Sequence, residues 1–110
     1  MTTSSHNEQQ ASLITQLINH WELLQFSTTQ IDTHKTILAS AGITSSFNFR
    51  QLQKHRKDTL RELYRCLLDV HTDSDFFRTF VTQLLEVSLQ EKFFHDIDTY
   101  NQKLNKLLNE

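Results

Sequence analysis

The side chains best able to do chemistry in this sequence are six arginines and lysines grouped within residues 50–65. This stretch holds only two acidic residues, so its formal balance is +4. Residues 1–49 and 66–110 carry −2 and −4, which with +4 return the net charge of −2. A basic segment between acidic flanks indicates a surface that attracts nucleic-acid phosphates or protein carboxylates. The predicted basic patch comprises Arg50, Lys54, Arg56, Lys57 and Arg61.

The same charges also fit an ordinary solvated helix face. On that interpretation they balance the acidic C-terminal helices, within the fold or across a dimer. Arg56 differs from its neighbours because it falls on the apolar seam through Phe49, Leu63 and Val70. We therefore expect this part of the helix to be less buried than the rest, or to be buried against something else.

Other side chains that could bind a metal or attack a substrate lack suitable spacing. None of the six histidines has a second histidine four residues away, the spacing that places two ligands on one helix face. Residues 69–75 begin like a calcium loop, but they lack its glycine, and Phe80 replaces the bidentate glutamate. Cys66 is predicted to be a buried thiol between leucines. We expect no catalytic residue, metal, cofactor or small-molecule substrate, and a protein that is not an enzyme.

Aromatic side chains concentrate near the starts of the last two predicted helices. The adjacent pairs 76/77 and 93/94 cannot both point into one narrow core, so one member of each is expected to face another neighbour or another chain. A wide core between several helices would account for them equally well. Steps of four and three from Phe93 to Leu107 also form a seam for a partner helix. The predicted partner-binding residues are Phe77, Phe94, Tyr100 and Leu104.

Composition sets the fold class into which these residues must fit. The chain has 110 residues, 37% of them hydrophobic, with one glycine, one cysteine and no proline. Few tight turns can be built from this composition, which argues against a β-sandwich, a β-barrel or a glycine-rich phosphate loop. We expect an all-α fold, a small four- to five-helix bundle, with a flexible tail at 1–7 and a single domain at 8–110. No apolar run reaches the roughly 20 residues of a membrane span, and no signal peptide is evident, so a cytoplasmic protein without membrane contact is expected.

Capping signals predict where the helices begin. Pairs with the S-x-x-E/Q spacing start at Ser5, Ser27 and Ser88. Gly42 is placed to end a helix in the left-handed conformation. Residues 44–46 offer three further caps, and 71–75 form a polar break. The predicted helices are 8–25, 28–40, 46–70 and two more after residue 75. We expect a short break before Ser88, but with no glycine or proline nearby the last two helices could instead be continuous.

Residues 28–57 resemble the helix-turn-helix layout in Ile37, Gly42 and Ile43, around a tight turn. That resemblance implies DNA binding through the second helix. The sequence departs from the layout because Asn48 and Gln51 stand where apolar residues are expected. We therefore do not assign the chain to this family.

Two functions follow from these residues. The first is a non-enzymatic protein-binding module, an adaptor, a chaperone-like protein or a stoichiometric inhibitor of the immunity-protein kind, that acts by helix-face docking. The alternative is a DNA-binding regulator that uses the basic segment 46–65 and dimerises through its C-terminal helices. Both interpretations predict a homodimer.

Overall fold

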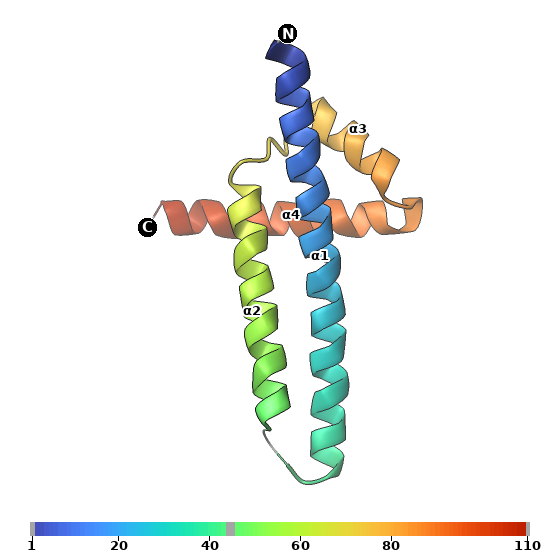
Figure 1. Cartoon of the computed structure of the whole chain (residues 1–110), viewed down its shortest axis with the longest axis vertical. Coiled ribbons are helices and arrows are strands. Elements are labelled where there is room, and N and C mark those ends of the chain that lie inside the picture. Colours follow the sequence, from blue (N-terminus) through green and yellow to red (C-terminus); the bar gives the residue numbers. More distant parts are fainter. Residues whose placement is uncertain (1, 44–45, 110) are drawn as a thin grey trace. The chain divides into compact units, whose positions relative to one another are not determined.

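The computed structural model describes residues 2–43 and 46–109, and their side chains from residue 6 onward. These residues form four helices and no strand, which confirms the all-α class (Figure 1). The helices are α1 (Thr2–Ser40), α2 (Phe47–Leu67), α3 (Asp75–Leu84) and α4 (Val87–Leu108). The chain divides into two compact units. We call Asn19–Leu63 the hairpin unit, and Met1–Ile18 with Tyr64–Glu110 the terminal unit.

Helix α1 is one continuous helix of 39 residues. The predicted start at residue 8 and the predicted break at 26–27 are therefore wrong. The Ser5 side chain lies outside the described side chains, and Ser27 is 1% exposed in the helix interior instead of capping a helix. Without glycine or proline here, the chain has no reason to stop. The Thr28 and Thr29 hydroxyls bond the carbonyls four residues back, as they do inside helices.

The end of α1 matches the prediction. Gly42 has a φ of +72°, which is the left-handed conformation. The Ile43 N–H donates to the Leu38 carbonyl at 2.9 Å, and the Gly42 N–H donates to the Ala39 carbonyl at 3.1 Å. This pair of bonds is the Schellman motif, which satisfies carbonyls that the helix end leaves free.

Within the hairpin unit, α1 and α2 run antiparallel. Thr28 bonds Arg56, and the His34 ring stacks on Phe49 with a centroid separation of 5.8 Å. Going forward along α1 therefore means going backward along α2, as Figure 1 shows. Helix α2 begins after Ser46, whose hydroxyl accepts from the Phe49 N–H at 3.1 Å, so this predicted cap is confirmed. Thr44 and Ser45, the other two candidate caps, lie outside the described residues.

In the terminal unit, side chains cap the connections around α3. Ser74 caps α3 by accepting from the Phe77 N–H at 3.1 Å, which confirms the predicted break before it. The short break between the last two helices is also confirmed. The predicted cap at Ser88 is wrong, because α4 already begins at Val87. Instead, Gln90 reaches back and donates to the Leu85 carbonyl at 2.8 Å.

The terminal unit has an aromatic core. Phe77, Phe93 and Phe94 pack with centroid separations of 6.0–6.2 Å. Phe93 is fully buried and Phe77 is 3% exposed. Leu84, in the last turn of α3, is exposed.

No helix in the described part of the chain is long and apolar enough to cross a bilayer. The flexibility of residues 1–7 stays a prediction.

Candidate binding surfaces

The hairpin unit presents a row of positive charge along α2. Successive positions four, three and four residues apart fall on one face of a helix of 3.6 residues per turn. All four side chains of the row are exposed. Over eleven residues the row is about 17 Å long, at 1.5 Å per residue. We call it the basic stripe, and it consists of Arg50, Lys54, Lys57 and Arg61.

Little negative charge lies against the basic stripe. Asp58 approaches Arg61 at 3.9 Å, and both side chains are more than half exposed, so this ion pair is weak. Within the described residues, no carboxylate pairs with Arg50, Lys54 or Lys57. The stripe therefore keeps its positive field available to an external anion.

Phe47 lies at one end of the stripe, three residues before Arg50. Its side chain is 67% exposed. Phenylalanine and arginine are both enriched at protein interfaces relative to the rest of the surface. The sequence reasoning did not single out Phe47, although it expected this half of the helix to be less buried than the rest. Its position in the first turn of α2 could have indicated this exposure, because a helix end leaves side chains uncovered.

Arg56 is separated from the other residues of the predicted basic patch. It lies off the line of the stripe and is half-buried, as its place on the apolar seam suggested. Its Nε donates to the Thr28 Oγ1 at 2.9 Å. Thr28 in turn donates its single hydroxyl proton to the Leu24 carbonyl, so its oxygen must accept from Arg56. This relay fixes the direction of the guanidinium.

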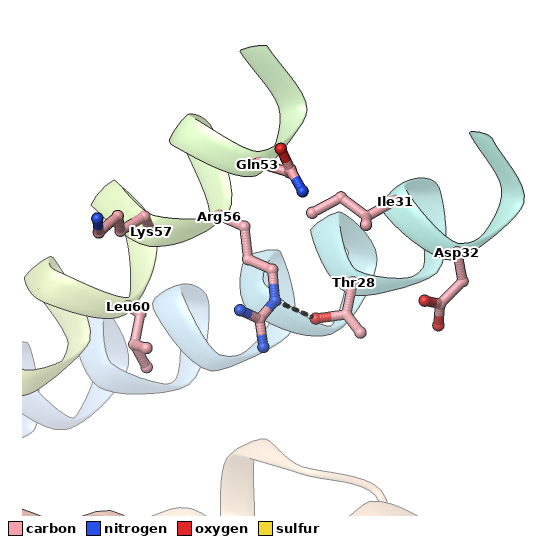
Figure 2. Close-up of a pocket in the computed structure, with 7 residues that line it drawn as sticks. All are labelled: Thr28, Ile31, Asp32, Gln53, Arg56, Lys57 and Leu60. Carbon is pink, nitrogen blue, oxygen red and sulfur yellow. Dashed lines mark hydrogen bonds between the residues drawn. The ribbon is translucent and has the colours of Figure 1, made fainter. Parts of the chain in front are cut away.

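Arg56 projects into an open groove between α1 and α2 of the hairpin unit (Figure 2). The groove has a volume of about 470 Å³. The Ile31 and Leu60 side chains give it apolar walls, and Lys57 adds a second cation. Its lining residues are Thr28, Ile31, Asp32, Gln53, Arg56, Lys57 and Leu60.

The predicted aromatic anchors lie in the terminal unit and differ in exposure. Phe77 is buried against Phe93 and Phe94, so it presents no docking surface in this structure. Phe94 is half-buried, with the Arg78 guanidinium 5.0 Å from its ring centroid. Tyr100 is half-buried and meets Tyr64 edge-on at 5.7 Å.

The end of α4 presents apolar side chains beyond these anchors. Leu104 is half-buried, whereas Leu107 and Leu108 are 61% and 65% exposed. Two adjacent exposed leucines leave the last turn of this helix open to another surface.

The terminal unit also holds Cys66, which is buried as predicted. Its Sγ donates to the Leu13 carbonyl at 3.2 Å. Burial raises the pKa of the thiol, and the nearby charge of Asp69 raises it further. This thiol is held in the protonated form, which is a poor nucleophile. Among the described residues, no group of three histidine, cysteine or acidic side chains is placed to hold a metal ion.

No family model, curated protein or solved structure matches this chain. Its function is therefore argued from its own surfaces, of which the basic stripe and the Arg56 groove combine charge with accessibility.

Proposed function

We propose that the protein is a non-enzymatic binding module whose basic stripe docks onto an acidic surface of a protein partner. The exposed alignment of Arg50, Lys54, Lys57 and Arg61 carries this proposal. Phe47 supplies an aromatic anchor at the end of the stripe, and the cations supply electrostatic complementarity.

A comparative capture experiment tests this proposal. Tagged wild-type protein is compared with an R50E/K54E variant and with a K103E/K106E variant, which makes the same charge change on exposed lysines of α4. The wild type and the α4 control should enrich the same protein, and R50E/K54E should lose it. Retention of that partner by R50E/K54E would contradict the role of the stripe.

DNA binding is the second candidate, because a row of cations about 17 Å long also suits duplex phosphates. The antiparallel hairpin does not favour it, since a helix-turn-helix crosses its two helices at roughly 90–120°. Fluorescence anisotropy with a labelled duplex separates the two functions. A DNA-binding stripe should give an affinity that falls steeply with salt and is lost in R50E/K54E. We expect no such binding.

The proposal extends to assembly and location. We infer a single-domain four-helix bundle that forms a homodimer through the exposed leucines of the last turn of α4, in the cytoplasm. An L107D/L108D variant should then sediment as a monomer, whereas the wild type sediments as a dimer. A monomeric wild type would refute the homodimer.

A further inference from the structure

We propose that the Arg56 groove is a binding site for one carboxylate, supplied by an aspartate or glutamate side chain of the acidic partner. This inference rests on the proposed function for the origin of the ligand. It concerns Arg56, which lies outside the basic stripe, whereas Lys57 belongs to both the stripe and the groove.

The Arg56 guanidinium has hydrogen-bond donors that no described group uses. Among the described residues, Arg56 makes one polar contact, from Nε to Thr28. No acceptor in that part of the chain engages Nη1 or Nη2, and neither atom is sealed from solvent. Arginine therefore keeps two parallel N–H donors free, which match the two oxygens of a carboxylate.

The Arg56 side chain is already restrained before a ligand binds. A free arginine side chain loses considerable rotamer freedom when it binds. Thr28 already restrains Arg56, and the walls of the groove restrict the aliphatic part of the side chain. A ligand consequently meets a donor pair whose direction is already set, which reduces the entropic cost of binding.

The groove is lined by both apolar and charged side chains. Figure 2 shows the Ile31 and Leu60 side chains on the same groove as the guanidinium. Aliphatic walls suit the methylene groups of a glutamate side chain, and Lys57 adds positive charge. Asp32 also lines the groove and opposes an anion. Its presence predicts that removing this charge improves binding.

The test uses side-chain Nε–Hε resonances of arginine in the full-length ¹⁵N-labelled protein. The probe is N-acetyl-glutamate N-methylamide, and N-acetyl-glutamine N-methylamide is its neutral isostere. The Arg56 signal, assigned from its loss in R56K, should shift saturably with the glutamate probe only. Methyl signals of Ile31 and Leu60 report binding in variants that lack Arg56.

Four variants sharpen the result. R56K should weaken binding about tenfold or more, because a lysine offers no fork. T28V should weaken it severalfold, and T28S should restore it. D32N should strengthen binding about two- to fivefold, an improvement that damage to the fold would not produce. Circular dichroism confirms that each variant is folded.

Three results would overturn the site: no saturable shift, equal shifts with both probes, or unchanged binding in R56K. Inorganic phosphate is the remaining arm. Phosphate binding as tight as that of the glutamate probe would replace the carboxylate site by a general oxyanion site. The R50E/K54E variant keeps the groove, so it should bind the glutamate probe within about threefold of wild type. If R50E/K54E loses the partner while the wild type does not bind the glutamate probe, the proposed function stands and the groove site is rejected.

Discussion

Side chains cap a helix start in both the hairpin unit and the terminal unit, but their long-range polar contacts differ. In the terminal unit, polar side chains close on backbone groups. Gln10 donates to the Asp69 carbonyl at 3.0 Å and accepts from the His71 N–H at 3.1 Å, while Ser74 caps α3. In the hairpin unit, Arg56 donates from Nε to Thr28, and its Nη1 and Nη2 groups stay open.

The two units also differ in how they treat aromatic side chains. The terminal unit gathers Phe77, Phe93 and Phe94 into one cluster. The hairpin unit leaves Phe26 and Phe47 58% and 67% exposed. The hairpin unit also buries Trp21 and Phe49, so only part of its aromatic surface lies in solvent. Among the described side chains, the most exposed phenylalanines therefore lie in the hairpin unit, which also carries the proposed docking stripe.

The largest expected effect comes from Phe93→Ala in the terminal unit. Removing a fully buried ring should lower the free energy of unfolding by about 3–5 kcal/mol. Phe26→Ala in the hairpin unit is the matched control and should cost less than about 1 kcal/mol, since this ring is largely solvated. Urea denaturation followed by circular dichroism measures both values. Similar losses in the two variants would break the comparison.

Gln10→Ala tests the polar closure of the terminal unit. The change removes both hydrogen bonds to the loop after α2 and should cost about 1–3 kcal/mol. The exposed neighbour Gln9 provides the control, because Gln9→Ala alters the same helix without those bonds. A Gln10→Ala variant as stable as Gln9→Ala would show that these bonds contribute nothing net.

Ser27→Ala should stabilise the protein. The Ser27 hydroxyl is buried in the hairpin unit without a partner among the described residues, and alanine removes it while favouring the helix. We expect a gain of about 1 kcal/mol in thermal or urea unfolding. Ser12→Ala, at an exposed α1 position, should gain only a few tenths. A destabilised Ser27→Ala variant would show that the hydroxyl stabilises the folded state.

The smallest expected effect concerns Cys66. Its pKa is raised above the ordinary value of 9.0, first by burial and then by Asp69. The folded state therefore holds this proton more tightly than the unfolded state does. The resulting stability is fully present below about pH 9 and is lost as the pH rises through the folded pKa. Cys66→Ala should flatten this alkaline decline, and iodoacetamide should react slowly with the native thiol but rapidly in urea.

Part of this architecture could be predicted because its signals are local. Gly42 ends a helix through its own backbone freedom, and Ser46 and Ser74 cap through bonds to residues three positions away. The wrong boundaries at Ser27 and Ser88 have the same origin. A capping pair starts a helix only where the packing of the neighbouring residues also favours a break. Here the buried Ser27 side chain belongs to the inward face of a continuous helix.

The candidate sites divide in the same way. The positive charge of residues 50–65 follows from composition. How these cations divide between a solvated stripe and the Arg56 groove depends on the neighbouring helix. The Arg56 guanidinium is held by Thr28 of α1, which is 28 residues away in the chain. Likewise, Phe77 and Phe47 have the same chemistry, and their exposed fractions of 3% and 67% depend on which element lies opposite.

The sequence by itself determined the all-α class, the glycine stop after α1, the break before α3 and the basic character of α2. These features depend on composition and on interactions within a few residues. Tertiary structure alone decided that α1 continues past Ser27, that Thr28 holds the Arg56 guanidinium, and that Phe47 rather than Phe77 is exposed. The reason is physical: hydrophobic burial acts between segments far apart in the chain, and its free energy exceeds that of a single cap.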